Sequence, residues 1–281
     1  FQDVNANNLG RDAATGFARR PLDNEGIQYG LLALRQGRIN TTQFLDVNER
    51  VGGYDIDGNI VPQRSVADAA TLARVYERGR VLSGGGGSYI ENILYKQKPF
   101  PVRAFFASIV GYATGNVTRH DTALGLFQWA NDSADPLSFL PALRHGTDDG
   151  GPVHVLMMQG IVDHYILPPI ANSISLSLGL DQAGEALDAK NAELSRFAPL
   201  GSLLDLVGRG PISLPASGNH DGPQGKVTAV VVQHPEDGIE DGHEVMFQTE
   251  APKHEYRCFL EGLAKGAPRV PGPGKAADPC E

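Results

Sequence analysis

The sequence predicts an α/β fold with a parallel sheet, because two short apolar runs are each followed by a loop and a helical segment. The first run spans residues 153–158 and precedes a helix expected from about Pro169 to Leu178. The second spans residues 227–232 and precedes a helix expected at about 252–263. Such apolar runs are typical of strands buried on both faces of a parallel sheet. Alternation of strands with helices indicates the α/β class.

The first 85 residues favour short amphipathic helices joined by turns. We expect one helix capped by Asp23, a second beginning at Thr41 or Thr42, and a third opened by Ser65. Each start has a capping residue ahead of an apolar stripe with helical spacing. We therefore predict that residues 1–85 form a helical lid or cap segment outside the sheet.

The rest of the chain is expected to form three parts. Residues 86–150 are predicted to be a linker and connecting region, because a run of glycines and a Lys/Pro-rich stretch mark their start. Within them, the apolar run Val102–Val110 fits a helix or a strand equally well. Residues 151–265 are predicted to be the sheet core, with an insertion at about 180–225. Residues 266–281 are predicted to be a tail.

Composition excludes some classes of partner. The formal net charge of −9 argues against a nucleic-acid partner, which would favour a basic surface. No apolar run approaches the roughly 20 residues that a membrane-spanning helix needs, so no membrane span is expected. The chain begins at Phe1 without a signal peptide or initiating Met. We therefore expect a processed or truncated N-terminus.

Two cysteines, Cys258 and Cys280, lie near the end of the chain. A disulfide between them would fix the tail to the helix that carries Cys258, and closing such a loop contributes about 3 kcal/mol in the chain-entropy model. The disulfide predicts an oxidising compartment, so we expect a secreted or periplasmic protein. The alternative is two free thiols.

Asp163 and His243 are the strongest candidates for catalysis. Asp163 lies in the loop after the first apolar run, residues 159–169 (QGIVDHYILPP), and His243 in the loop after the second, residues 237–245 (DGIEDGHEV). Both loops resemble the acid and histidine loops of the α/β-hydrolase fold, in the order acid then histidine. The resemblance implies that Asp163 orients His243 as a general base for a hydroxyl nucleophile. Taken alone, an Asp after a strand is often only a turn former.

The chain has no G-x-S-x-G pentapeptide, the pattern that holds the nucleophilic serine of such enzymes. Ser88 and Ser108 are followed by bulky residues where a small one is needed, and Ser217 comes after Asp163. We therefore identify no nucleophile in this chain. We expect it in an N-terminal half or a partner chain.

The N-terminal region supports this expectation. Residues 10–31 (GRDAATGFARRPLDNEGIQYGL) and 44–59 (FLDVNERVGGYDIDGN) resemble the middle region of large bacterial α/β-hydrolase-like proteins, a family whose members are mostly uncharacterised. In that family a serine-bearing half precedes this region. The resemblance implies that this chain is the C-terminal portion of such a protein, a partial hydrolase sheet made of the last strands and helices.

These observations predict the acid/base half of a serine hydrolase that cleaves an ester or amide bond in a small-molecule or polymeric substrate, without a cofactor. One alternative is a non-catalytic binding or assembly protein on a hydrolase scaffold. Another is a metal-dependent hydrolase, for which the candidate ligands would be His234, Asp237, Asp241 and His243. We favour no metal site, and we interpret residues 55–59 as a plain turn.

The other histidines are expected to have no catalytic role. His154 and His164 are predicted to be structural, and His220 and His234 are predicted to face solvent, because they lie in turn-rich segments.

Overall fold

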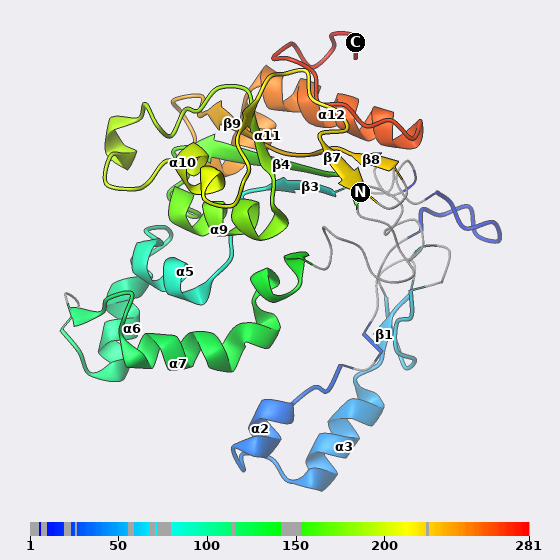
Figure 1. The fold of residues 1–281 in the computed structure, drawn as a ribbon. Coiled ribbons are helices and arrows are strands. Elements are labelled where there is room, and N and C mark those ends of the chain that lie inside the picture. Colours follow the sequence, from blue (N-terminus) through cyan, green and yellow to red (C-terminus); the bar gives the residue numbers. More distant parts are fainter. Residues whose placement is uncertain are drawn as a thin grey trace. The chain divides into compact units, whose positions relative to one another are not determined.

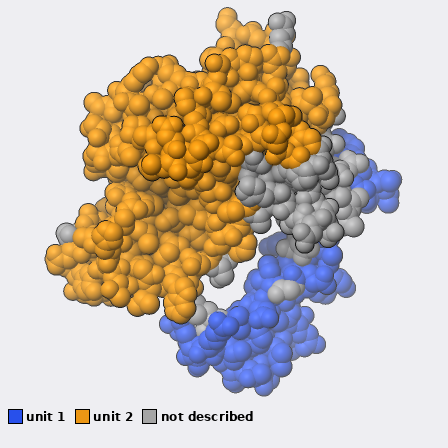
Figure 2. All heavy atoms as spheres, in the orientation of Figure 1, with its two compact units in different colours: residues 1–77 blue, residues 78–281 orange. Residues whose placement is uncertain are grey.

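The computed structural model describes residues 6, 10–19, 24, 25, 27–55, 59–67, 71, 80–113, 116–141, 153–222 and 225–280. The chain divides into two compact units, Phe1–Glu77 and Arg78–Glu281, which Figure 2 shows in separate colours. None of the helices in the described part of the chain has the length and apolarity that a membrane crossing needs.

The described part of the first unit includes two short helices and a β-hairpin. They are α2 (Leu31–Arg35), α3 (Thr41–Arg50), β1 (Gly53–Tyr54) and β2 (Ile60–Val61). The predicted helix at Thr41 is confirmed: the Asn40 side chain accepts the Gln43 N–H, and the Gln43 side chain accepts the Asn40 N–H. The helix expected from Asp23 begins only at Leu31, and Asp23 itself lies outside the described residues.

The apolar residues of α3 are more exposed than the predicted amphipathic helix would suggest. No residue of α3 is buried, and Leu45 is 59% exposed.

The turn of the hairpin is held by Asp55, whose side chain accepts the Asn59 N–H at 2.9 Å. Residues 56–58, and most of the helix expected after Ser65, lie outside the described residues.

The second unit is built on a parallel five-stranded sheet with the order β3-β4-β9-β5-β6. Its strands are β3 (Arg80–Ser83), β4 (Val155–Ile161), β5 (Asp181–Ala183), β6 (Pro211–Ile212) and β9 (Ala229–Pro235). The α/β class and the two predicted strands, β4 and β9, are confirmed. The expected insertion at 180–225 is corrected, because it supplies β5 and β6 to the sheet. The expectation that residues 1–85 lie outside the sheet is also corrected, because Arg80–Ser83 form β3.

Helices cover both faces of this sheet (Figure 1). On one face, Met157 and Val231 pack with α9 (Pro168–Leu178) and α10 (Leu200–Asp205). On the other, the alternate strand residues pack against Phe259 of α12 (Glu250–Ala264). Every residue of β4 is buried, as expected for a central parallel strand.

Residues expected to form a linker are instead largely helical. They form α5 (Tyr89–Tyr95), α6 (Val102–Val110) and α7 (Thr122–Asn131), which share a small core around Phe106 and Leu124. The ambiguous run 102–110 is thus a helix. Polar side chains start two of these helices: Ser88 accepts the Glu91 N–H, and Asp121 accepts N–H groups at the start of α7.

The remaining elements connect these layers. They are the 3₁₀ turns η2 (Asp132–Ala134), η3 (Pro136–Ser138), η4 (Ala192–Leu194) and η5 (Gly242–Glu244), the hairpin strands β7 (His220–Gly222) and β8 (Gly225–Val227), and the helix α11 (Val245–Gln248).

Candidate active site

Asp163 and His243 lie in the loops that follow β4 and β9. These strands are parallel neighbours, so their carboxyl ends meet at the same edge of the sheet, where sites of α/β folds form. The two side chains are in contact, with His243 Nδ1 3.0 Å from Asp163 Oδ2. Residues 80 positions apart in the sequence therefore form one pair.

The Asp163 carboxylate is held in a fixed orientation. Its Oδ1 atom accepts the backbone N–H groups of Tyr165 at 2.8 Å and Ile166 at 2.7 Å. This leaves Oδ2 directed at the imidazole. The Asp163 side chain is only 4% exposed, so water competes little for the hydrogen bond to His243.

The imidazole of His243 packs against two neighbours. The Tyr165 ring stacks on it, with ring centroids 4.9 Å apart. Gly84, the first residue after β3, also lies against it: a Cβ added at Gly84 would be 2.7 Å from Cε1. The Nε2 atom forms no hydrogen bond with any described residue, and the side chain is 30% exposed. An imidazole held at Nδ1 and open at Nε2 can accept a proton from a hydroxyl.

Two glycines allow the loops to approach closely. A Cβ added at Gly160 would lie 1.9 Å from the carbonyl oxygen of Gly242. The Gly242 N–H donates to the carbonyl of Val162 at 3.0 Å. Any larger side chain at Gly160 would push the histidine loop away from the aspartate loop.

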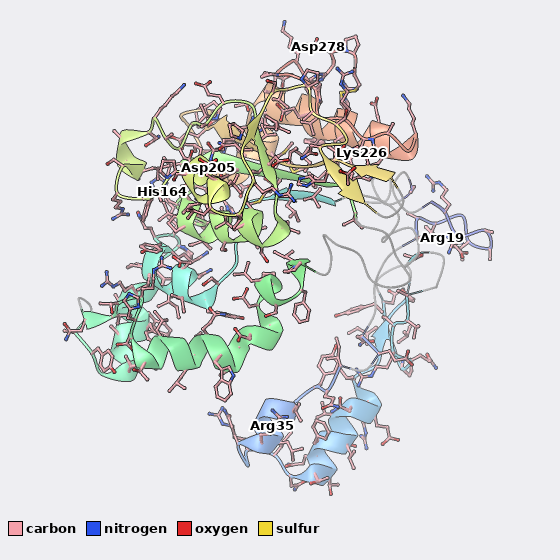
Figure 3. All side chains as sticks on the ribbon, viewed as in Figure 1. Arg19, Arg35, His164, Asp205, Lys226 and Asp278 are labelled. Atoms are coloured by element: carbon pink, nitrogen blue, oxygen red, sulfur yellow. A yellow bond between two sulfur atoms is a disulfide. The ribbon has the colours of Figure 1, made fainter. Side chains whose placement is uncertain are left out.

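His164 contacts two carboxylates that its sequence position does not predict. Its Nδ1 atom lies 2.9 Å from Asp241 Oδ2, and its Nε2 atom lies 2.8 Å from Glu193 Oε1. Burial lowers the pKa of His164, but the two carboxylates outweigh this effect and raise its pKa above the ordinary value. His164 lies at the end of the sheet where β4 leads into α9 (Figure 3).

Two other histidines are buried, which corrects the expectation that they face solvent. His220 is 3% and His234 4% exposed. His234 Nε2 lies 3.0 Å from a carboxylate oxygen of Glu255, and His220 Nε2 lies 3.2 Å from one of Asp181. A carboxylate inside the fold makes burial of each imidazole tolerable.

His154 has a structural contact. Its Nδ1 atom accepts the Thr228 N–H at 2.9 Å.

The candidate metal ligands do not form one cluster. His234 contacts Glu255, Asp241 contacts His164, and His243 contacts Asp163. In the described ranges, no three His, Cys, Asp or Glu side chains are grouped so that they could hold a metal ion.

The serines weighed as nucleophiles lie elsewhere. Ser88 caps α5, and Ser108 is exposed on α6. Ser83, at the end of β3, lies in no sequence pattern typical of a nucleophile; its Oγ atom is buried and has no hydrogen-bond partner among the described residues. No described serine forms a hydrogen bond with His243.

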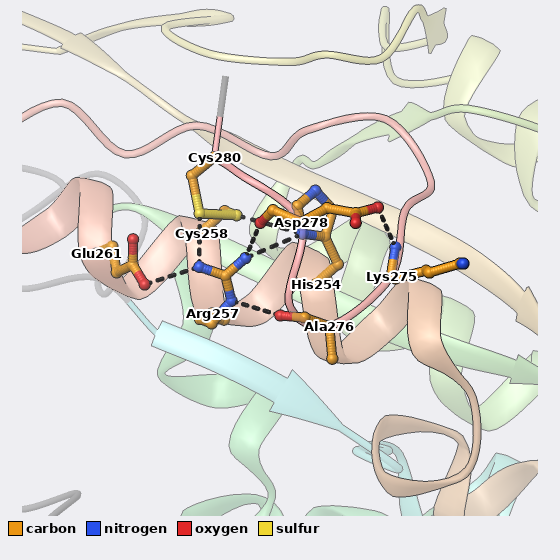
Figure 4. Close-up of a disulfide and its surroundings, with 8 residues drawn as sticks. All are labelled: His254, Arg257, Cys258, Glu261, Lys275, Ala276, Asp278 and Cys280. Atoms are coloured by element: carbon orange, nitrogen blue, oxygen red, sulfur yellow. Dashed lines mark hydrogen bonds and ion pairs between the residues drawn. A yellow bond between two sulfur atoms is a disulfide. The ribbon is translucent and has the colours of Figure 1, made fainter.

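The tail is tied to α12 by the disulfide Cys258–Cys280 (Figure 4). Arg257 reinforces this connection, because its guanidinium donates to the carbonyl oxygens of Ala276, at 2.8 Å, and of Asp278. The predicted disulfide is thus present.

Comparison with known proteins relates only the first third of the chain to a family. Residues 1–96 match a tannase-like family of unknown function (DUF6351). This segment includes β3 and α5 but neither Asp163 nor His243. No curated protein and no solved structure matches the chain.

Proposed function

We propose that this chain supplies the acid/base half of a serine hydrolase that cleaves carboxylic esters. The observation that carries the proposal is the contact of His243 Nδ1 with Asp163 Oδ2 at 3.0 Å, with Nε2 open. The tannase-like match of residues 1–96 supports an esterase over an amidase. In this role Asp163 keeps the proton on Nδ1 and stabilises the imidazolium that forms when Nε2 takes the serine proton.

The position of His243 suggests where the serine lies. Among the described residues, β3 pairs only with β4 and is therefore an edge strand. The His243 ring lies over Gly84, at the carboxyl end of β3. A further parallel strand would lie about 4.8 Å beyond β3, with its carboxyl end beside the ring. We place the serine on such a strand, in an N-terminal segment or a partner chain.

The first unit and the disulfide bear on the substrate and the location of the enzyme. The first unit, with its exposed apolar residues on α3, is proposed as a lid over a small-molecule or polymeric ester. The disulfide favours an oxidising compartment, so we propose a secreted or periplasmic enzyme.

Labelling with a fluorophosphonate probe tests this function. The natural full-length protein is labelled, and mass spectrometry identifies the modified serine. We expect one labelled serine outside residues 1–281, and loss of labelling in His243→Gln. The exposed His120 provides the matched control His120→Gln, which should be labelled like the wild type, as should Ser83→Ala.

Two results would overturn the proposal. Labelling that persists at the wild-type rate in a folded His243→Gln variant would exclude His243 as the base. A folded full-length protein that neither reacts with the probe nor hydrolyses model esters would favour a binding or assembly protein.

A further inference from the structure

A cleft of about 390 Å³ lies among α5, α9 and residues 196–203. Its walls are mostly apolar, and two of its aromatic rings, Tyr95 and Phe197, contact each other edge to face with centroids 5.2 Å apart. The cleft is within the range of volumes, about 300–1,000 Å³, that small-molecule sites occupy. Neither Asp163 nor His243 lines this cleft.

The cleft carries one excess positive charge. Arg119 forms a two-point ion pair with Glu91, with Arg119 Nη2 2.9 Å from Glu91 Oε2. Arg196 also lines the cleft, and its guanidinium lies 4.7 Å from the centre of the Phe197 ring. No carboxylate in the described part of the chain forms an ion pair with Arg196. One cation is thus balanced and the other is available to an anion.

A buried amide adds a directed donor. Asn172 lines the cleft and is 2% exposed. Its Oδ1 atom accepts from Gln159 Nε2 at 3.0 Å, and Gln159 Oε1 accepts from Gln233 Nε2 at 3.0 Å. The Gln233 oxygen in turn accepts the Asp188 N–H. This chain of bonds fixes which end of the Asn172 amide is the donor. Its Nδ2 atom has no hydrogen-bond partner among the described residues.

We propose that this cleft binds a small monocarboxylate with an aromatic body. The carboxylate would take a charge-assisted hydrogen bond from Arg196 and the free N–H of Asn172, and its ring would pack on Tyr95 and Phe197. A single negative charge matches the single unpaired cation. The proposal does not depend on the proposed hydrolase activity, because it concerns binding at other residues.

Calorimetric titration of the full-length protein with benzoate tests the site. We expect saturable binding of benzoate, and binding of the neutral isostere benzamide that is at least tenfold weaker. Arg196→Gln should weaken benzoate about tenfold, which is the order of effect of one charge-assisted hydrogen bond. Arg196 is exposed, so this change should leave the fold intact. The exposed Arg269, which does not line the cleft, provides the matched control Arg269→Gln, which should retain wild-type affinity.

Two further measurements locate the ligand. In ¹H–¹⁵N spectra, benzoate should shift the Asn172 side-chain amide signals. His243→Gln should bind benzoate as the wild type does, which separates this cleft from the proposed catalytic pair. The proposal is overturned if benzoate does not bind, if benzamide binds equally well, or if folded Arg196→Gln keeps full affinity.

Discussion

The carboxylate of Asp241 accepts a hydrogen bond from the backbone N–H of His243, with Oδ1 at 3.1 Å. The same oxygen accepts the backbone N–H of His164 at 2.9 Å, and Oδ2 lies 2.7 Å from Lys98 Nζ. Since His164 directly follows Asp163, one carboxylate connects the backbones of both loops. Burial raises the pKa of Asp241, but the bonds from Lys98 and the two loops lower it below its ordinary value.

Asp241→Ala should therefore loosen the Asp163–His243 pair without touching either side chain. We expect a loss of about 2–3 kcal/mol in the free energy of unfolding, because the change removes several charge-assisted hydrogen bonds. Ester hydrolysis should fall in kcat more than it changes in KM. Asp237→Ala is the matched control, since Asp237 is exposed in the same loop and, among the described residues, its side chain accepts only nearby backbone N–H groups. Equal kcat in the two variants would contradict a positioning role for Asp241.

Asp163→Asn should lower kcat by about 10³–10⁴-fold, the order of loss seen when a triad aspartate is made neutral. The Asn side chain fills the same space but presents no carboxylate to hold the Nδ1 proton. KM should change little, because Asp163 is buried and does not reach the substrate. Steady-state kinetics of the full-length protein measure both constants. Asp205→Asn, at an exposed position at the end of α10, should behave as the wild type.

Gly84→Ala should displace the His243 ring. The new Cβ would lie 2.7 Å from Cε1, and the backbone at Gly84 has φ +58°, which disfavours a side chain. We expect slower labelling by the fluorophosphonate probe, together with a small loss of stability. Gly85→Ala is the control, because a Cβ there meets nothing within 4 Å. If both variants react at the wild-type rate, the ring does not lie across the end of β3 in solution.

The pH dependence of stability should show the contribution of His164. Its folded-state pKa is raised above the unfolded value of about 6.5. The stabilisation is thus fully present below about pH 6.5 and is lost as the pH rises through the raised pKa. Urea unfolding of wild type and His164→Gln should give a stability difference that is largest at low pH and shrinks above that pKa. A difference that does not vary with pH would show that the charged imidazole contributes nothing.

The sequence predicted those parts of the fold whose signals are local. The strands β4 and β9 follow from their apolar runs, and α3 follows from the apolar spacing after Thr41, although the capping residue is Asn40. Pairing of Asp163 with His243 could be expected because each follows such a strand.

Other parts depend on contacts that no local pattern records. The strand β5 is three residues long, and two of them, Asp181 and Gln182, are polar, so its sequence does not predict a buried strand. The glycine run before Ser88 and the following Lys/Pro-rich stretch predict a linker, but α5 and α7 form there, and the run 102–110, which fits a helix or a strand from its sequence, is the helix α6. The contact of His164 with Asp241 joins residues 77 positions apart, and nothing in either loop alone indicates it.

The buried amides of Gln159 and Gln233 have a consequence for how the sheet is aligned. These two residues are directly opposite each other on β4 and β9. Gln233 Nε2 donates to Gln159 Oε1, and Gln233 Oε1 accepts the Asp188 N–H. If β4 slipped by one residue, Gln159 would turn to the opposite face of the sheet, and several buried polar groups would lose their partners at once. The apolar neighbours Met157 and Val231 would tolerate such a slip far better than the amides. Two glutamines thus select one alignment of the strands, and with it the starting points of the loops that carry Asp163 and His243.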